Sequence, residues 1–225
     1  MKLWRITFTG ADDETDLKEL EKISADYPNV EWGILFSQSK SGVPRYPSHE
    51  NIEKMCDLNI TRSAHLCGQW VGDVLEGNFS FLTTPFAPHF ERIQLNCYKD
   101  RLNKALKKQI PSSKDHKVIL GGNFSDIKLT QETHPDLNVC VLFDASGGHG
   151  KSPKTWPSAF DGFSCGYAGG LRPENLEDNL KKLDEVVNSR QIWIDMETGV
   201  RTNEKFDLSK VKKCLEIAEP WLLKG

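Results

Sequence analysis

Short apolar runs alternate along the chain with segments in which apolar residues recur every three or four positions. Each apolar run is bounded by turn residues, as is typical of buried strands. The intervening segments, such as the one with Leu176, Leu180 and Leu183, have the periodicity of amphipathic helices. The predicted strands are residues 4–9, 31–37, 63–67, 92–96, 117–120, 139–144, 163–168 and 191–195. This alternation predicts a single α/β domain, a (β/α)8 TIM barrel over residues 1–225, in preference to an open doubly wound sheet.

The predicted helices differ in how clearly the pattern marks them. Pro173 suits the first position of a helix over residues 173–187, and a final helix covers residues 208–222. Ser48 is a suitable N-cap for a helix over residues 48–56, and the acidic residues 12–16 suit the start of an earlier one. Weaker patterns indicate helices at 70–75, 102–110 and 125–134.

A barrel of this kind places its functional residues where the strands end. The predicted strand ends are Thr9, Ser37, Cys67, Asn96, Gly121, Asp144, Ala168 and Asp195. Lys117 begins a strand, so we expect it at the opposite end of the barrel, away from any chemistry.

Composition narrows the classes of partner. The net charge is −3, and basic and acidic residues are mixed throughout, so we expect no nucleic-acid partner. No apolar run has the length of a membrane span, and the N-terminus lacks a signal-peptide pattern. Six scattered cysteines suggest reduced thiols. Together these features predict a soluble cytoplasmic protein that does not bind membranes and needs no cofactor.

Residues 139–150, VCVLFDASGGHG, combine a buried-strand pattern with an acid and a glycine-rich turn. Asp144 ends the strand and is therefore expected at the barrel mouth, where this fold carries its functional residues.

Two neighbouring loops indicate an anion site. The strand at 163–168 runs into AGGLRPEN, and the last strand runs into DMETGVR. In this fold, paired loops after the seventh and eighth strands offer backbone amides to a phosphate. Gly169, Gly170, Thr198 and Gly199 are the candidate phosphate-binding residues. The alternative is that these glycines only form tight turns.

The motifs in this order resemble those of the phosphoribosylanthranilate isomerase family of ribulose-phosphate-binding barrels. FDASGGHGK, AGGLRPENL and IDMETGVR are similar to the patterns of its last three strands, and GILFSQSKSGVPRYPS and RIQLN to patterns further upstream. The resemblance implies a phosphorylated small-molecule ligand and an Amadori rearrangement, in which an acid protonates the ring oxygen and a base removes the C2 proton of the sugar.

The resemblance assigns roles to particular residues. Asp144 matches the family's general acid, which would need apolar surroundings that raise its pKa. Arg45 matches a substrate-contacting arginine suited to a carboxylate, and Asp195 matches a family aspartate. Further ligand-contacting positions are Asn96, Gly148, His149 and Lys151.

The sequence departs from the family pattern at the base. The family's cysteine at the end of the first strand aligns with Thr9, whose hydroxyl titrates too high to act alone. Glu197 and Arg201 also replace a serine and a glutamate. Glu197, Asp12 or Asp13 could supply the base, although Asp12 and Asp13 are equally suited to helix capping. A carboxylate at position 197 needs a cationic partner or an orientation away from the phosphate site.

Other interpretations stay open. The protein could be a binding protein that keeps the phosphate site without the chemistry. His65 and Cys67 alternate along one strand and could, with Asp144, hold a metal as in some sugar-phosphate epimerases. Trp70 and Trp156, in predicted loops, are candidates for stacking on a ligand.

Overall fold

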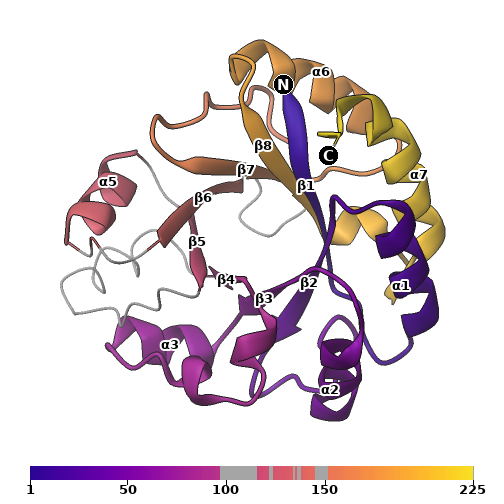
Figure 1. Cartoon of the computed structure of the whole chain (residues 1–225), viewed down its shortest axis with the longest axis vertical. Helices are drawn as coiled ribbons and strands as arrows, with labels where there is room; N and C mark the ends of the chain where they lie inside the picture. Colours follow the sequence, from indigo (N-terminus) through magenta and orange to yellow (C-terminus); the bar gives the residue numbers. More distant parts are fainter. Residues whose placement is uncertain (97–115, 122–123, 134, 136–137, 145–151, 225) are drawn as a thin grey trace.

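The strands of this protein close into a parallel barrel in simple sequence order (Figure 1). A computed structural model describes residues 1–96, 116–121, 124–133, 135, 138–144 and 152–224. The strands are β1 (Lys2–Thr9), β2 (Val30–Phe36), β3 (Arg62–Leu66), β4 (Arg92–Leu95), β5 (Lys117–Gly121), β6 (Asn138–Asp144), β7 (Ser164–Ala168) and β8 (Gln191–Met196). Because β1 pairs with both β2 and β8, the sheet has no free edge. The predicted TIM barrel is confirmed.

Helices surround the barrel on its outside (Figure 1). They are α1 (Leu17–Asp26), α2 (His49–Asp57), α3 (Gln69–Leu75), α5 (Phe124–Thr133), α6 (Leu176–Val186) and α7 (Leu208–Ala218). Short 3-10 turns are η1 (Ser80–Thr83), η2 (Ala87–His89), η3 (Thr198–Val200) and η4 (Glu219–Trp221), and a hairpin joins β9 (Arg201–Thr202) to β10 (Lys205–Phe206). The helix predicted at 102–110 lies outside the described residues.

Side-chain caps fix where three of these helices begin. The carboxylate of Asp16 accepts hydrogen bonds from the amides of Lys18 and Glu19 at the start of α1. Ser48 caps α2 as predicted, and Asp207 caps α7. Each cap satisfies amides that would otherwise have no partner, which stabilises a helix by about 1 kcal/mol.

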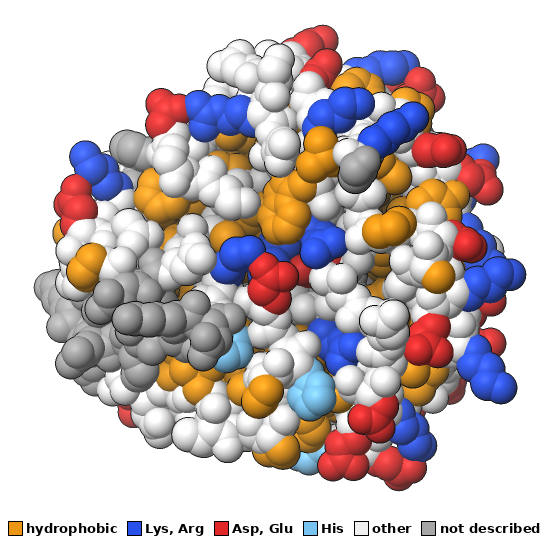
Figure 2. All heavy atoms as spheres, in the orientation of Figure 1, with side chains coloured by type: hydrophobic (Ala, Val, Ile, Leu, Met, Phe, Trp, Pro, Cys, Tyr) orange, Lys and Arg blue, Asp and Glu red, His pale blue; other side chains and the backbone are white. Residues whose placement is uncertain are grey.

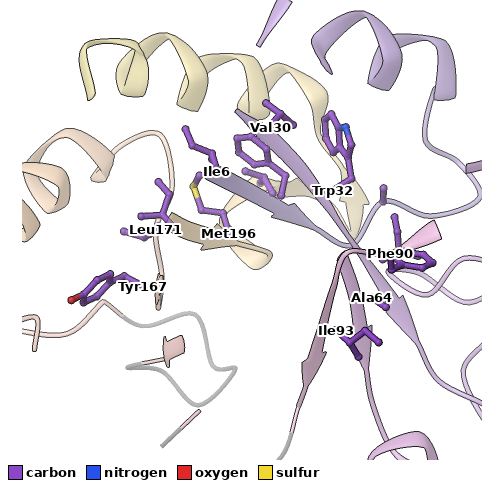
Figure 3. Packing of buried hydrophobic residues seen from close by; sticks show 14 of the residues in the cluster. Ile6, Val30, Trp32, Ala64, Phe90, Ile93, Tyr167, Leu171 and Met196 are labelled. Atoms are coloured by element: carbon purple, nitrogen blue, oxygen red, sulfur yellow. The ribbon is translucent and has the colours of Figure 1, made fainter. Parts of the chain in front are cut away.

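The main core lies between the barrel and its helices. Outward-facing strand residues such as Ile6, Trp32 and Ile93 pack in this layer (Figure 3). The indole of Trp32 also donates to the hydroxyl of Ser24 on α1 at 2.8 Å. Leu20, Leu180 and Leu215 close the layer from the helix side and are fully buried. The period-of-two pattern of the strands and the helical periodicity thus meet in one apolar layer.

The inside of the barrel is divided into an apolar and a charged part. Ile119, Cys140, Leu142 and Trp193 form a small apolar cluster. Beside it Arg92 pairs with Glu31 at 3.2 Å, both almost fully buried, and its guanidinium lies 4.2 Å from the ring centre of Trp193. At the start of the strands, Lys117 pairs with Glu91, so Lys117 is at the predicted end, away from the mouth.

The surface mixes charges of both signs. On the face shown in Figure 2, basic and acidic side chains are interspersed with apolar ones. None of the helices in the described part of the chain has the length and apolar character to cross a lipid bilayer. The described cysteines Cys56, Cys67, Cys140, Cys165 and Cys214 are free thiols, the last three of them buried.

Candidate active site

A buried hydrogen bond joins the ends of the first and last strands at the barrel mouth. Oγ1 of Thr9 donates to Oδ1 of Asp195 at 2.8 Å. The two residues are 1% and 8% exposed, so little water competes with this bond. Barrel closure brings them together, because β1 and β8 are neighbours although 186 positions separate the two residues. No described residue donates to the second oxygen, Oδ2.

The surroundings of Asp195 favour its protonated form. Burial is the main cause that raises its pKa, the nearby Glu197 and Glu31 add to the effect, and the hydrogen bond from Thr9 and the charge of Arg92 oppose it. The resulting pKa is about 7. A carboxyl group with such a pKa can both accept and release a proton near neutrality, as general acid–base catalysis requires. Asp195 is therefore the described carboxylate with the electrostatics of a proton-transfer group.

Gly33 leaves the space in which Thr9 meets Asp195. A Cβ atom at position 33 would lie 2.2 Å from Oγ1 of Thr9 and 2.9 Å from Nε2 of His65. Sequence reasoning did not single out this residue. The signal was present, because an isolated glycine inside an apolar strand often marks the close approach of another group.

His65 faces the barrel interior as predicted, but its contacts are those of a core histidine. Nε2 lies 3.0 Å from Oγ of Ser63, and burial, aided by Arg92, lowers the pKa of His65 to about 3. The ring is therefore neutral. Burial also raises the pKa of the Cys67 thiol. Within the described ranges, no group of three or more His, Cys, Asp or Glu side chains could hold a metal ion.

Asp144 ends β6 at the mouth, as predicted. It is in register with Ala168 on β7, which is in register with Asp195 on β8, so the two acids lie two strands apart. The usual strand spacing puts their Cα atoms roughly 10 Å from each other. The predicted apolar surroundings are not found, because the side chain of Asp144 is exposed. The buried acid of this pair is Asp195.

A buried arginine clamps the loops after β1 and β8. Nη1 of Arg201 donates to the carbonyl of Gly10 at 2.6 Å, and Nη2 donates to Oδ2 of Asp12 at 2.9 Å and to the carbonyl of Glu204. This ion pair and the amide of Arg45 occupy Oδ2 of Asp12, so the geometry does not favour Asp12 as the missing base. Asp13 accepts a hydrogen bond from the amide of Ser48 at 2.7 Å, and the cap of α1 is Asp16 instead.

Glu197 turns toward the loop after β2. Its Oε1 accepts a hydrogen bond from Nη1 of Arg45 at 3.0 Å, and Nη2 of Arg45 lies 3.5 Å from Oε2 of Glu204. The cationic partner that a carboxylate needs at position 197 is thus Arg45. This pairing joins two predicted site residues whose contact the sequence did not indicate.

The two predicted phosphate-binding loops touch each other. A Cβ atom at position 199 would lie 1.9 Å from the carbonyl oxygen of Leu171, so only glycine allows this approach. Gly169 and Gly170 have positive φ angles of 133° and 61°. The carbonyl of Gly170 accepts from Nδ2 of Asn175 at 2.9 Å and from Ser152 at 3.2 Å. No described residue accepts a hydrogen bond from the backbone amide of Gly169 or of Gly170. Thr198 begins η3 in the same region.

Asn96 belongs to a chain of polar contacts on the opposite rim. Its Nδ2 donates to Sγ of Cys67 at 3.1 Å, and its Oδ1 accepts from Gln94 at 2.7 Å. Tyr46 lies close to Cys67, and burial, aided by this neighbour, raises the pKa of Tyr46. These residues link the loops after β2, β3 and β4, and Tyr46 was not identified from the sequence.

Several predicted ligand contacts are not at the mouth or are not described. Trp156 is buried and donates to Oδ1 of Asn179 at 3.1 Å, so it is a core residue rather than a stacking platform. Trp70 lies within α3, which confirms the weak helical pattern at 70–75 rather than a loop, and it packs edge-on against Phe81 at 5.8 Å between ring centres. Gly148, His149 and Lys151 lie outside the described residues.

Comparison with solved structures identifies the fold. The phosphoribosyl anthranilate isomerase of Thermus thermophilus superposes with a TM-score of 0.56 at 15% identity, covering 96% of this chain and 98% of that one. The N-(5'-phosphoribosyl)anthranilate isomerase of Pyrococcus furiosus gives 0.56 at 14%, covering 96% and 98%. The enzyme of Thermococcus kodakaraensis gives 0.51 at 14%, covering 97% and 99%. The predicted resemblance to these proteins is confirmed, and at this identity it shows the fold alone.

Sequence comparison adds a local match. A segment of 85 residues is 34% identical to the multifunctional tryptophan biosynthesis protein of Schizosaccharomyces pombe. It covers 36% of this chain and only 10% of that protein. No family model matches the chain.

Proposed function

We propose that this protein is an intramolecular isomerase of an N-substituted ribosylamine phosphate. The ligand's phosphate binds at the loops after β7 and β8, and the sugar lies across the mouth between Asp144 and Asp195. The observation that carries the proposal is the buried Thr9–Asp195 hydrogen bond, because it provides a proton acceptor where the missing base is required.

The base in this proposal is Asp195. Thr9 occupies Oδ1 and orients the carboxylate, so that Oδ2 takes the C2 proton of the sugar. A pKa of about 7 suits a group that must accept this proton and release it again near neutrality. Thr9 thus acts as a positioning residue rather than as the base.

Asp144 supplies the acid. Its protonated form gives a proton to the ring oxygen, which breaks the bond from that oxygen to C1 and leaves an open-chain iminium ion. Loss of the C2 proton to Asp195 yields an enolamine, and protonation at C1 with loss of the enol proton gives the ketose. Ala168, the small residue in register between the two acids, leaves room for the sugar.

The phosphate site is inferred from the glycine loops. The amides of Gly169 and Gly170 have no described protein acceptor, and the contact between Gly199 and Leu171 holds the two loops together. Amides of this kind bind phosphate without any net positive charge. We also propose a cytoplasmic location, which suits the free thiols among the described cysteines.

The test compares Asp195→Asn and Asp144→Asn with the surface control Asp178→Asn. Turnover of N-(5-phosphoribosyl)aniline and of N-(5-phosphoribosyl)anthranilate is measured together with the affinity for ribitol 5-phosphate. We expect both site variants to lose at least about a thousandfold in turnover, since each removes a proton-transfer group, with phosphate-sugar affinity nearly unchanged. Wild-type turnover in either variant would remove that residue from the mechanism.

A second candidate function is a non-catalytic phosphosugar-binding protein. It is favoured by the absence of a thiol at position 9 and by the pairing of Arg45 with Glu197, which occupies a predicted substrate contact. Thr9→Cys separates the two candidates. Gain of turnover on the anthranilate compound would indicate an isomerase that has drifted. Tight binding of ribitol 5-phosphate without turnover in wild type and variant would favour the binding protein.

A further inference from the structure

The Arg45–Glu197 ion pair lies beside Gly10, the residue that follows Thr9. A Cβ atom at position 10 would lie 3.8 Å from Cβ of Arg45 and 3.7 Å from Cγ of Glu197. Glu197 itself is two residues beyond Asp195 on the loop after β8. The half of a ligand that extends from the sugar past Thr9 therefore meets this pair.

The guanidinium of Arg45 is held in place from both ends. At the backbone end, Arg45 has a left-handed φ of 78°, which is unfavourable for a non-glycine residue. Its amide donates a hydrogen bond to Oδ2 of Asp12 at 3.0 Å. At the far end Glu197 and Glu204 contact the guanidinium. The side chains of Arg45 and Glu197 are 28% and 37% exposed, so both remain within reach of a ligand.

Among the described residues, two further basic groups near this position do not offset the acids. Arg201 is buried, and its Nη1 and Nη2 are held by Gly10, Asp12 and Glu204, away from a ligand beside Arg45. Lys40 is exposed and lies over the ring of Tyr46, 5.2 Å from its centre. One accessible guanidinium thus faces two carboxylates, those of Glu197 and Glu204.

We infer that Glu197 makes the site selective for a ligand whose non-phosphate half is neutral or cationic beside Arg45, and that it excludes a carboxylate there. A ligand carboxylate would have to displace Glu197 from Arg45 and leave that acid beside a like charge. A neutral or basic group leaves the pair intact, and a basic group gains attraction from Glu197. The inference rests on the proposed function, since it assigns the substrate class of that same site.

The experiment measures affinities of three non-reacting probes. Ribitol 5-phosphate is the reference, 1-phenylamino-1-deoxyribitol 5-phosphate is the neutral probe, and its 2-carboxyphenyl counterpart is the anionic probe. Wild type should bind the neutral probe about tenfold more tightly than the anionic one, the size of effect expected from one unfavourable charge contact. Glu197→Gln and Glu197→Ser should abolish this preference, chiefly by tighter binding of the anionic probe.

Glu204→Gln is the matched control, because Glu204 also contacts Arg45 but is 74% exposed and more distant. It should keep the wild-type preference, and unchanged affinity for ribitol 5-phosphate reports that each variant is folded. The inference is overturned if wild type prefers the anionic probe or does not discriminate, or if the Glu197 variants keep the wild-type ratio. Failure of wild type to bind even ribitol 5-phosphate would instead overturn the proposed function.

Discussion

Thr9 and Asp195 come from the first and last strands of the barrel, which are neighbours, and share a hydrogen bond of 2.8 Å at the mouth. Their burial raises the pKa of Asp195 to about 7, while Thr9 holds one of its oxygens in place. The account of function depends on this pair, and the following expectations are derived from it and from the glycines around it.

Activity should depend on the ionisation of Asp195. As the base, it works in its deprotonated form, so kcat/KM should rise with pH and level off above an apparent pKa of about 7. Thr9→Val removes a hydrogen bond that favours the charged form of Asp195. The rise of kcat/KM should therefore move to higher pH in this variant. Thr9→Ser keeps the hydroxyl and should keep the wild-type profile. A rate that does not change between pH 5 and 9 would contradict the assignment.

The ionisation of Asp195 should also make the free energy of unfolding depend on pH, falling as the pH rises where kcat/KM increases. The folded state holds a proton on Asp195 up to about pH 7, whereas an unfolded aspartate releases it near its ordinary value of 3.8. The contribution of protonated Asp195 to stability is therefore complete below pH 3.8, the ordinary pKa of the group, and is lost as the pH rises through about 7. Relative to Asp195→Asn, the wild-type free energy of unfolding should fall by about 2–4 kcal/mol from pH 4 to 8. Urea unfolding of both proteins at several pH values measures this, and parallel curves would refute it.

Gly33 should be required for the Thr9–Asp195 contact. Gly33→Ala places a methyl group 2.2 Å from Oγ1 of Thr9, which must then move. We expect a loss of about 100-fold in kcat, since displacement of a catalytic group by about 1 Å has that effect, with a smaller change in the affinity for ribitol 5-phosphate. Gly121→Ala is the control, because its nearest neighbour, the carbonyl of Leu142, is 3.7 Å away. Equal kinetics in the two variants would show that Gly33 has no such role.

Gly199 should instead control phosphate affinity. A methyl group there meets the Leu171 carbonyl at 1.9 Å and would separate the loops after β7 and β8. Gly199→Ala should weaken the binding of ribitol 5-phosphate by about tenfold or more, by displacing amides that donate to the phosphate. Gly72→Ala on α3, with only Gln69 side-chain atoms within 4 Å, should bind like wild type. Isothermal titration calorimetry distinguishes these outcomes.

The fold and the position of the site could be predicted because they depend on local patterns. Apolar runs bounded by turns located the eight barrel strands to within one or two residues of their ends, and the barrel rule then placed Thr9, Asp144 and Asp195 at the mouth. The contact between Thr9 and Asp195 was also within reach, since closing a barrel makes the first and last strands neighbours.

The side-chain environments could not be predicted, because they depend on distant parts of the chain. Glu197 and Arg45 are 152 positions apart, and their ion pair exists only once the loops after β2 and β8 meet. Trp156 lies in an irregular segment, yet α6 covers it and gives it the partner Asn179. Asp144 ends an apolar strand but is exposed, while Asp195 ends a similar strand and is buried.

The central claim, that Asp195 removes the C2 proton, is tested most directly by hydrogen exchange at that carbon. N-(5-phosphoribosyl)aniline deuterated at C2 is incubated with wild type and with Asp195→Asn, and deuterium release to water is followed. The account predicts release by wild type, with a primary isotope effect on turnover. It also predicts loss of at least about a thousandfold in Asp195→Asn, which still binds ribitol 5-phosphate. Release at the wild-type rate by Asp195→Asn would contradict it.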